Sequence, residues 1–357
     1  MKSNYDILGN HIRLIDTRNR ESITDRVLGI NIDKFFMPSV ANVIGTDLSK
    51  YKLITKGKFA CNPMHVGRDE RLPVALYDEE KPAIVSPAYF MFEVIDNSIL
   101  NEDYLMMWFR RPEFDRICWL HTDGSVRGGI TWDDICRLEL PIPPIENQLE
   151  IVNSYKAITE RIALKQKIND NLDDTAQTLY QKYFESNLDK SSWKQGTVGD
   201  VLQLQRGHDL PRTEMTGGKY PVAGSTGTIG YHDEFTAEAP VIVMGRSGNI
   251  GNPRLYLCNC WTHNTSLYVK QIYEAEPLWV FYLLKNLNYD GFVGGSAVPT
   301  LNRNDVHAYG IAIPPLELQK SFSQKVMSLI YCKEENLSEI EKLQELQKII
   351  LTTMSSR

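Results

Sequence analysis

The chain contains two copies of one pattern, and this repeat limits the possible folds more than any other feature of the sequence. Residues 140–148 read LPIPPIENQ, and residues 311–319 read IAIPPLELQ 171 positions later. The same offset aligns Ile130 with Leu301 without a gap. Copies of this length are too long to be units of a solenoid, whose repeats run to about 20–45 residues. The repeat therefore predicts two domains of similar design.

A long helical pattern follows each copy of the IPP motif. No proline or glycine interrupts either pattern, and the paired prolines suit the first turn of a helix, where no N–H donor is needed. Apolar residues recur at alternating steps of four and three, a heptad seam that indicates helices paired along their length. The seam residues are Ile151, Tyr155, Ile158, Ile162, Leu172 and Leu179 in the first helix, and Phe322, Val326, Leu329, Ile340, Leu343 and Ile350 in the second.

Polar residues occupy the middle of each seam. Lys165 and Asn169 take these positions in the first helix, and Lys333 and Asn336 take them in the second. Polar seam residues fix the register of paired helices at some cost in stability. We expect each helix, about 39 residues and about 58 Å long, to pair with the other copy. The alternative is that each helix packs only on its own domain.

The segments before the two helices are rich in β-branched and aromatic residues, glycine and proline, which predicts strands joined by turns. Two shorter stretches have the apolar content of short helices. Each segment is therefore expected to be mixed α and β. The candidate strands are Leu53–Ala60, Ala83–Val94, Pro240–Met244 and Leu267–Lys270, and the candidate helices are Tyr104–Arg111 and Leu278–Leu287.

The composition is that of a globular protein, with 42% hydrophobic and 24% charged residues. No run approaches the roughly 18 apolar residues of a membrane helix. The N-terminus, MKSNYDILGN, lacks the apolar core of a secretory signal. Six cysteines, mostly far apart, indicate reduced thiols. We therefore expect a cytoplasmic protein.

Charge is distributed unevenly along the chain. The formal net charge of −6 argues mildly against a nucleic-acid binder, but residues 49–68 and 239–273 contain basic side chains and no acid. Local charge decides whether a phosphate backbone can dock; a solvated surface is the alternative interpretation. The predicted phosphate contacts are Lys56, Lys58, Arg68, Arg206 and Arg246. The predicted base-reading residues, chosen because polar side chains near glycines can reach a groove, are His65, Arg127, Ser247, Asn249 and Asn302.

No motif predicts catalysis in this chain. The glycines of GRSGNIG, residues 245–251, have the wrong spacing for a dinucleotide site, and GSTGTIG, residues 224–230, is most simply a loop. No P-loop or GxSxG nucleophile motif occurs. The chain also lacks the NPPY-like tetrapeptide and glycine-rich cofactor motif of an amino-methyltransferase. We therefore expect no cofactor bound by the chain itself.

Two residue sets have the chemistry of a metal or nuclease site, but neither is complete. Cys258, Cys260 and His263 offer three ligands, whereas a structural zinc site needs four. Asp69, followed by Glu79 and Lys81, has a faint nuclease pattern, but the segment DERLPVALYDEEK is expected to be an exposed loop. We therefore predict no metal site.

The combination of these motifs, in this order, resembles the specificity subunit of type I restriction–modification enzymes. The resemblance rests on LPIPPIENQLEIV, INDNLDDTAQTLYQKYF, AIPPLELQKSF and GSAVPTLNRNDV, and it extends over essentially the whole chain. It implies an α+β fold with a pseudo-two-fold repeat. Residues 1–144 and 190–315 would be target-recognition domains, separated by an antiparallel pair of long coiled-coil helices at residues 145–189 and 316–357.

The resemblance also implies the function. Such a subunit reads a bipartite, asymmetric site in double-stranded DNA and has no catalytic residues of its own. It recruits two modification subunits, which bind S-adenosylmethionine and methylate adenine N6, and restriction subunits, which use ATP and Mg. We expect the partners to dock on the outer faces of the long helices, with Glu160, Gln166 and the region of Asn336 as candidates.

The chain departs from the family pattern at one loop. Gly124-Ser125-Val126-Arg127 lacks the Pro-Thr found at Pro299-Thr300, and the two copies share little sequence before residue 123. The two domains should therefore read different half-sites. Three alternatives remain at this point: a specificity subunit of a type II-like, two-subunit system, a coiled-coil interaction protein without a DNA role, and a stand-alone enzyme.

Overall fold

The computed structural model describes residues 5–64, 66–122, 128–289, 293–294 and 300–354. The chain divides into two compact units. Unit 1 comprises Met1–Leu164 and Glu339–Arg357, and unit 2 comprises Lys165–Ser338. Both division points lie inside the two long helices, α5 (Ile145–Tyr180) and α9 (Leu316–Thr353), so each unit contains a part of both.

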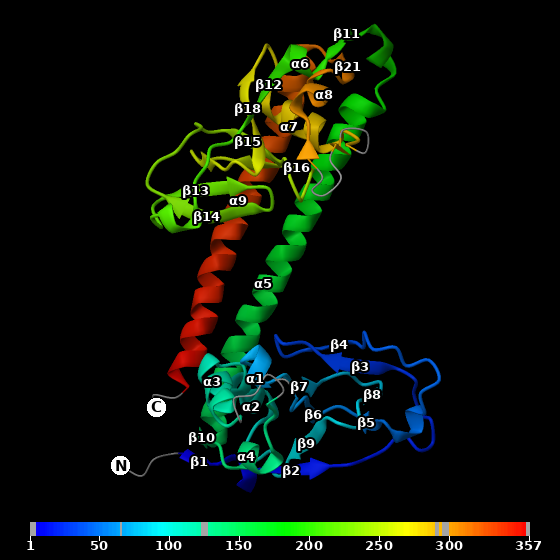
Figure 1. Cartoon of the computed structure of the whole chain (residues 1–357), viewed down its shortest axis with the longest axis vertical. Helices are drawn as coiled ribbons and strands as arrows, with labels where there is room; N and C mark the ends of the chain where they lie inside the picture. The colour runs from blue at the N-terminus through cyan, green and yellow to red at the C-terminus, as the bar shows by residue number, and fades with distance from the viewer. Residues whose placement is uncertain (1–4, 65, 123–127, 290–292, 295–299, 355–357) are drawn as a thin grey trace. The chain divides into compact units, whose positions relative to one another are not determined.

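Unit 1 is built on two four-stranded sheets with short helices beside them (Figure 1). The first sheet has the order β2 (Ile12–Ile15), β9 (Phe90–Val94), β6 (Lys58–Cys61), β7 (Val74–Tyr77), and the second has the order β4 (Phe36–Pro38), β3 (Val27–Ile30), β8 (Ala83–Val85), β5 (Lys52–Ile54). A further pair joins β1 (Tyr5–Ile7) to β10 (Glu139–Pro141). The helices are α1 (Val66–Asp69), α2 (Glu102–Phe109), α3 (Pro112–Leu120) and α4 (Trp132–Cys136), with helical turns at Leu8–Asn10 and Leu48–Lys50.

Unit 2 has a four-stranded sheet and a three-stranded sheet. The first has the order β12 (Leu202–Arg206), β18 (Ser266–Ile272), β15 (Val241–Gly245), β16 (Gly251–Tyr256), and the second has the order β14 (Gly227–His232), β13 (Tyr220–Gly224), β17 (Trp261–Thr262). Two pairs join β11 (Lys194–Thr197) to β21 (Gly310–Ile313) and β19 (Val293–Gly294) to β20 (Thr300–Leu301). The helices are α6 (Val198–Val201), α7 (Pro277–Lys285) and α8 (Arg303–His307), with turns at Gln181–Glu185, Leu188–Ser192 and Arg212–Glu214.

The repeat seen in the sequence is a repeat of topology. In both first sheets, the four strands taken in chain order lie in the spatial order first, fourth, second, third. A helix follows the fourth strand in each unit, α2 in unit 1 and α7 in unit 2. Helices α4 and α8 start and end at positions 171 residues apart. The predicted α+β class, with two mixed parts of one design and a pair of long helices, is confirmed.

Aromatic side chains fill the core of each unit. In unit 1, Phe59 and Phe92 stack with ring centroids 5.0 Å apart, and Phe109 meets both edge-on. In unit 2, Phe322 of α9 is fully buried and its ring lies 5.1 Å from Phe184. Large buried aromatic rings contribute much of the apolar area that stabilises a core. Because α9 contributes to this core, the long helices pack on the domains as well as on each other.

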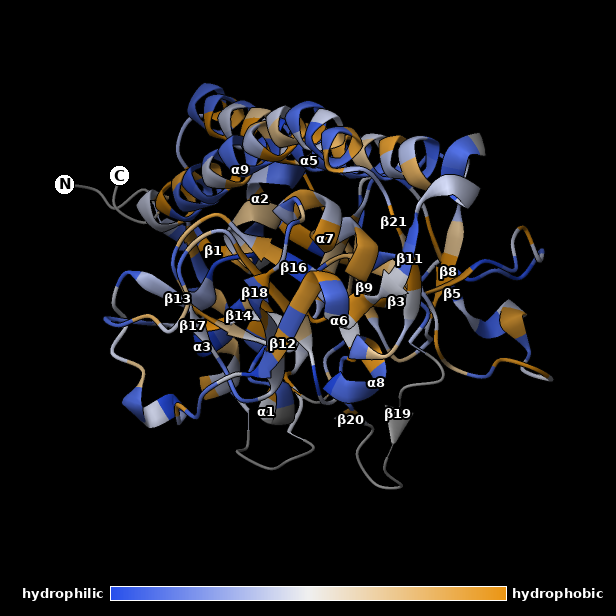
Figure 2. Ribbon diagram, turned by 90° about the horizontal axis from the view of Figure 1, so that it is seen from above, coloured by the Kyte–Doolittle hydropathy of each residue, from blue (hydrophilic) through white to orange (hydrophobic). Residues whose placement is uncertain are grey.

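The long helices run antiparallel within each unit. In unit 2, Asn336 Nδ2 donates to Asn169 Oδ1 at 2.9 Å, and Lys333 lies 2.5 Å from Asp173. In unit 1, Arg161 forms an ion pair with Glu339, and Gln347 donates to Thr159 at 2.7 Å. All twelve apolar seam residues are buried or half-buried. In Figure 2, α5 and α9 alternate hydrophobic and hydrophilic bands, as expected for helices with one apolar stripe.

The polar middle of the seam is buried as a hydrogen-bonded group. Asn336 is 8% exposed and Asn169 is 5% exposed. Lys165 Nζ donates to Asn336 Oδ1 at 2.8 Å. Lys165 and Asn336 occupy equivalent positions of the repeat. The helices α5 and α9 therefore contact each other here through equivalent residues. Asn336 is therefore unavailable for the partner docking predicted from the sequence, because it lies between the helices.

Several local predictions need correction. The expected strand Leu53–Ala60 is β5 and β6 joined by a turn at Gly57, whose φ of +81° favours glycine. The expected strand Ala83–Val94 is β8 and β9, joined by a turn in which Tyr89 N donates to Ser86 O.

Two expected loops also contain strands. Residues 224–230 comprise the last residue of β13, the turn and most of β14 in the β13–β14 hairpin. The segment of residues 69–81 contains β7, whose Val74 and Tyr77 are buried, because the four apolar residues VALY outweigh the charges around them.

Candidate nucleic-acid interface

One backbone hydrogen bond occurs in both units and holds equivalent loops. In unit 1, the loop of residues 62–73 joins β6 to β7, and Ile130 N donates to Pro63 O at 3.1 Å. In unit 2, the loop of residues 246–250 joins β15 to β16, and Leu301 N donates to Arg246 O at 2.8 Å. Ile130 and Leu301 are aligned by the sequence repeat. Each unit therefore has a loop at the equivalent position of its first sheet.

The unit 1 loop contains two of the predicted DNA contacts. Arg68 lies in α1, which forms part of this loop. Gly67 N donates to Gly128 O at 3.0 Å, so the loop is tied to the segment that follows residue 127. His65 and Arg127 lie outside the described residues. Of the predicted contacts in this part of the chain, the structure therefore describes the backbone position of Arg68 alone.

Lys56 and Lys58 lie at the other end of β6, away from this loop. Lys56 forms an ion pair with Glu80, whose hydrogen bond raises the pKa of the ammonium group. Lys58 forms an ion pair with Glu93, a carboxylate that also accepts from Arg13. The structure does not bring these two lysines together with Arg68. Each would have to exchange a carboxylate for a phosphate in order to contact DNA.

The unit 2 loop is tied to two other turns through Thr265. Arg246 N and Ser247 N both donate to Thr265 O, at 3.0 and 3.3 Å. Ser225 N donates to Thr265 Oγ1 at 3.3 Å, and Asn249 Nδ2 donates to Ser225 O at 3.2 Å. Three of the predicted contacts, Arg246, Ser247 and Asn249, therefore lie in one group of connected turns.

The end of β12 reaches the same group. His208 N donates to Thr262 O at 2.7 Å, and Asn264 donates to Asp209. Arg206, at the end of β12, is exposed and lies 3.9 Å from Asp209. We call this group the Thr265 cluster; it comprises Arg206, His208, Ser225, Arg246, Ser247, Asn249 and Asn264 around Thr265.

Glycines allow the Thr265 cluster to form. A Cβ on Gly245 would lie 1.5 Å from Asn249 O, and a Cβ on Gly207 would lie 2.2 Å from His263 O. Gly248 has a φ of +78°. The GRSGNIG sequence therefore makes a tight strand-to-strand loop, and β16 follows where a dinucleotide site would have a helix.

Sequence reasoning missed His208, Ser225 and Asn264. These residues lie next to glycines or within turns, but they are far apart in the sequence. Only strand pairing brings them to Thr265. Gly207 followed by His208 was the one local signal, because a glycine at the end of a strand often marks a close approach of two backbones.

Asn302 has a local structural role that the sequence prediction did not include. It is the N-cap of α8, and its Oδ1 accepts from Asn304 N at 3.0 Å. Thr131, at the equivalent position of the repeat, caps α4, and its Oγ1 accepts from Asp134 N at 3.1 Å. Capping by Asn or Thr satisfies a backbone N–H that the helix leaves without a partner. The predicted base-reading role of Asn302 would therefore compete with its hydrogen bond as a helix cap.

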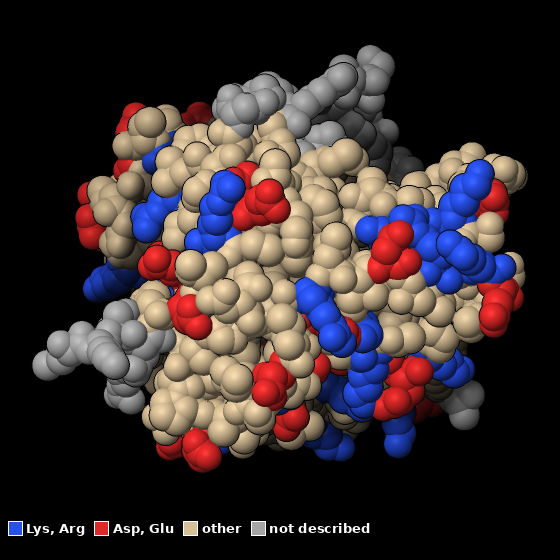
Figure 3. Space-filling model, turned by 90° about the horizontal axis from the view of Figure 1, so that it is seen from below, with Lys and Arg blue, Asp and Glu red and all other residues tan. Residues whose placement is uncertain are grey.

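Charged side chains of both signs lie on the surface of the described residues. On the face drawn in Figure 3, Lys and Arg lie interleaved with Asp and Glu. Among the residues that the structure describes, no group of His, Cys, Asp and Glu could hold a metal ion. Cys258 is exposed whereas Cys260 is buried, so the two thiols do not share one environment. No helix of the described part is long and apolar enough to cross a membrane.

Comparison with curated proteins identifies distant relatives. The chain is 22% identical over 397 aligned positions to a putative type I restriction enzyme MjaX specificity subunit from Methanocaldococcus jannaschii, with 98% of this chain and 88% of the relative covered. It is 24% identical over 191 positions to the type I restriction enzyme HindI specificity subunit from Haemophilus influenzae, with 53% of this chain and 40% of the relative covered.

Solved structures share the fold. The crystal structure of a type I restriction–modification system S subunit from M. genitalium matches with a TM-score of 0.61 and 16% identity, covering 99% of this chain and 96% of that chain. A chain from a structure that describes complex assembly and conformational transition of the type I R-M system matches with a TM-score of 0.50 and 16% identity, covering 98% of this chain and 97% of that chain.

The family comparison covers the second copy of the repeat and its helix. Residues 190–349 match the model of the type I restriction modification DNA specificity domain. This range contains the Thr265 cluster, α8 and most of α9. Residues 190–349 are therefore similar to the type I restriction modification DNA specificity domain, and the whole chain is similar to a putative type I restriction enzyme specificity subunit.

Proposed function

We propose that the chain is the DNA-reading specificity subunit of a type I restriction–modification complex. The observation that carries the proposal is the pair of equivalent loops, each held by the same hydrogen bond to Ile130 or Leu301. Polar and cationic residues in such loops can contact phosphates and base edges. Two loops of different sequence would read two different half-sites, so the recognised site would be bipartite and asymmetric.

The proposed assignment of domains follows the repeat. Residues 1–144 and 190–315 are the two target-recognition domains, and residues 145–189 and 316–357 are the helices that pair. In this scheme, phosphate contacts come from Arg68, Arg206 and Arg246, with Lys56 and Lys58 as secondary contacts because they are already paired with carboxylates. The base-reading candidates are Ser247, Asn249 and Asn302, together with His65 and Arg127.

The proposed partners carry the chemistry. Two methyltransferase subunits would bind S-adenosylmethionine and methylate adenine N6, and restriction subunits would use ATP and Mg. We expect this assembly in the cytoplasm, because its proposed substrate is DNA. Apolar side chains on the outer faces of the long helices support docking there: Leu164 is 60% exposed, Tyr331 is 56% exposed, and Leu337 is 40% exposed. Glu160 and Gln166 are exposed on α5 and remain candidates.

A competition experiment tests the proposal. The full chain, with the subunits that co-purify with it, is bound to a labelled duplex carrying the site found by methylome sequencing. Unlabelled duplexes with either or both half-sites scrambled then compete. Specific binding is expected to be at least about 10³-fold tighter than binding to the fully scrambled duplex. Equal competition by all duplexes would rule out the proposed function, and co-purification with a methyltransferase would exclude a coiled-coil protein without a DNA role.

Charge removal in the Thr265 cluster tests where DNA binds. Arg246→Ala is expected to weaken binding to all sequences, because a phosphate contact carries no sequence information. The slope of log K against log salt should become shallower by about 0.9, since one fewer counterion is released. Lys270→Ala is the matched control, because Lys270 is exposed in the same acid-free stretch but lies outside the cluster. An unchanged slope for Arg246→Ala would remove this residue from the interface.

A further inference from the structure

A buried lysine in unit 1 has no role in the proposed contacts. Lys34 lies in the turn between β3 and β4 and is 4% exposed. Its φ of +67° is uncommon for a residue with a side chain. Burial of an ammonium group costs free energy unless the charge is paired and hydrogen-bonded. A lysine that is kept in such a position needs a specific partner.

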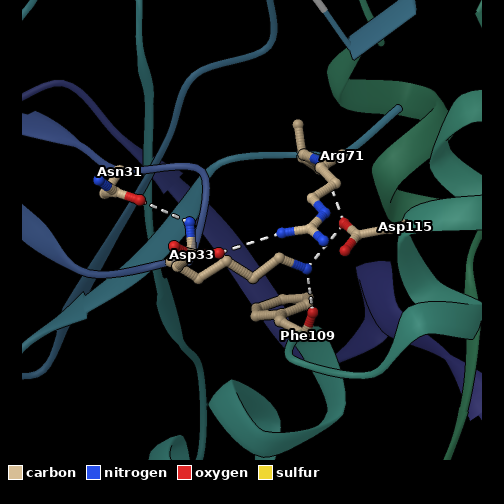
Figure 4. Close-up of polar contacts among 7 residues, drawn as sticks. Asn31, Asp33, Arg71, Phe109 and Asp115 are labelled. Carbon is tan, nitrogen blue, oxygen red and sulfur yellow. Dashed lines mark hydrogen bonds and ion pairs between the residues drawn. The ribbon is translucent and has the colours of Figure 1, made fainter. Parts of the chain in front are cut away.

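The partner of Lys34 is Asp115, at the start of α3. Lys34 Nζ lies 2.7 Å from Asp115 Oδ1 and donates to Phe109 O at the end of α2; Asp115 and Phe109 are labelled in Figure 4. Lys34 Nζ also lies 4.7 Å from the centre of the Phe114 ring. Burial lowers the pKa of Lys34 from its ordinary value, and the charge of Asp115 opposes that shift. The ammonium group thus ties the β3–β4 turn to the junction of α2 and α3.

The same carboxylate holds the end of the β6–β7 loop. Asp115 Oδ1 also accepts from Leu72 N at 3.1 Å. One residue earlier, Arg71 forms a 3.0 Å ion pair with Asp33 in the β3–β4 turn (Figure 4). Asp115 Oδ1 therefore accepts two hydrogen bonds, one from the Lys34 side chain in the β3–β4 turn and one from the backbone of Leu72 in the β6–β7 loop.

Packing and polar ties together hold this end of the loop, since the Leu72 side chain is buried in the core of unit 1. A cavity of about 880 Å³ is lined by Lys34, Asp69, Glu70, Arg71 and Asp115, among other residues. Its presence means that the loop end borders open space on this side. On this side of the loop the polar ties add to the packing of Leu72, and the Leu72 hydrogen bond is shielded from solvent, because Asp115 is only 14% exposed.

The corresponding loop of unit 2 is held differently. Besides the hydrogen bond from Leu301 N that it shares with the unit 1 loop, its ties within the described residues run to Thr265 and Ser225, and glycines allow the close approach. The two loops therefore share one support and differ in the others. A change in the support of one loop should leave the other loop unaffected.

We propose that the Lys34–Asp115 pair is a positioning device for the reading of one half-site. Lys34 neutralises and orients Asp115, Asp115 fixes Leu72, and Leu72 sets where the end of the β6–β7 loop lies. Neither residue touches DNA in this scheme. The inference rests on the proposed function, because it requires the β6–β7 loop to contact DNA.

The test replaces the pair by apolar residues of similar volume. Such a replacement of a buried ion pair is often neutral or stabilising, but the lost acceptor of Leu72 N costs about 1–3 kcal/mol, so Lys34→Met/Asp115→Leu should still fold, with a somewhat lower melting temperature than the wild type. Each half-site has a discrimination ratio, the affinity for the intact duplex divided by that for the duplex with this half-site scrambled. One ratio is expected to fall about tenfold, within the usual effect of one mismatched base pair, while the other stays constant.

Two further variants locate the effect. Lys34→Met/Asp115→Asn removes both charges but keeps an oxygen acceptor for Leu72 N, so both ratios should remain near their wild-type values. Arg26→Met/Glu79→Leu removes an exposed 2.5 Å ion pair of the same unit, and both ratios should be unchanged.

The outcomes separate this inference from the proposed function. A wild-type protein with no discrimination at either half-site would overturn the proposed function. A normal wild type together with both ratios intact in Lys34→Met/Asp115→Leu would overturn only the positioning role. Equal losses at both half-sites with a lower melting temperature would also overturn it, because they would reflect stability alone. If Lys34→Met/Asp115→Asn lowered the same discrimination ratio as much as Lys34→Met/Asp115→Leu does, the Leu72 hydrogen bond would not be the cause of the effect.

Discussion

Gln148 and Gln319 show how a short motif acts through single side chains. Each is the glutamine of its IPP motif, and each is at most 1% exposed. Gln148 Oε1 accepts from Asn101 N, and its Nε2 donates to Pro143 O. Gln319 makes the same two kinds of contact, to Glu276 N and Pro314 O. Asn101 and Glu276 are the N-caps of α2 and α7. The motif therefore joins the start of each long helix to the start of a domain helix.

Removal of this amide should destabilise one unit. Gln319→Ala would leave a buried backbone N–H and a buried carbonyl without partners, at a cost of about 1–3 kcal/mol for each buried group left unsatisfied. Denaturant unfolding should show a lower midpoint with an unchanged slope. Gln166→Ala, at an exposed position of α5, is the control. Identical midpoints for the two variants would contradict the role of Gln319.

His307 should make the stability of unit 2 depend on pH. Its Nε2 accepts from Leu204 N at 2.8 Å, which only the neutral ring can do. Burial, together with the charge of Arg303, lowers the pKa of His307 below its ordinary value of 6.5. The unfolded state therefore takes up a proton first as the pH falls, and the free energy of unfolding should decrease from pH 6.5 downward.

The pH prediction has a direct control. His307→Gln keeps a hydrogen-bond acceptor but does not titrate, so its unfolding free energy should change less between pH 7 and pH 5 than that of the wild type. The comparison uses urea unfolding at each pH. A wild type and variant with parallel pH profiles would show that His307 does not contribute.

At the scale of secondary structure, the seam residues of α5 and α9 are the clearest example of a coupled set. Lys165, Asn169 and Asn336 share two hydrogen bonds in the middle of the helix pair. Asn336→Leu alone would leave Lys165 and Asn169 without this partner and should cost about 1–3 kcal/mol. Asn169→Leu/Asn336→Leu should recover part of that loss, because two leucines can pack against each other in a seam.

A double-mutant cycle measures this coupling. The two single variants and the double variant are compared by thermal unfolding, and a coupling energy of about 0.5–3 kcal/mol is expected for residues in contact. Leu337→Ala, which truncates an exposed residue of α9, should change stability little. Strictly additive effects of Asn169→Leu and Asn336→Leu would contradict the shared hydrogen-bond group.

The sequence predicted the helices far better than the loops. A heptad pattern is local, so the start of α5 and α9 directly after their prolines, and the seam itself, could be read from spacing. Loop positions depend on strand pairing between distant residues. Thr265 carries no motif, yet it connects Ser225, Arg246 and Ser247. The Lys34–Asp115 pair joins residues 81 positions apart and likewise has no local signal.

At the scale of the whole molecule, the paired helices are expected to set the spacing between the half-sites. An insertion of four residues next to Asn169 adds about 6 Å of helix at 1.5 Å per residue. Four residues are about 1.1 turns, so the apolar stripe is shifted around the helix by only about 40°. The expected result is a changed gap between the two methylated half-sites, with the half-site sequences unchanged. Methylome sequencing measures both. An unchanged gap would show that α5 does not determine the spacing.

The contact between Lys165 and Asn336 also governs which helices can associate. In an antiparallel pair built from a repeat, equivalent positions meet each other only at the centre of the pairing. Here the residue types at those positions differ, and the ammonium group of Lys165 donates to the amide oxygen of Asn336. If α5 associated with α5 of another molecule in the same register, two lysines would meet in a half-buried site and repel each other. One substitution between the copies thus disfavours homodimers through α5 and favours assembly within one chain.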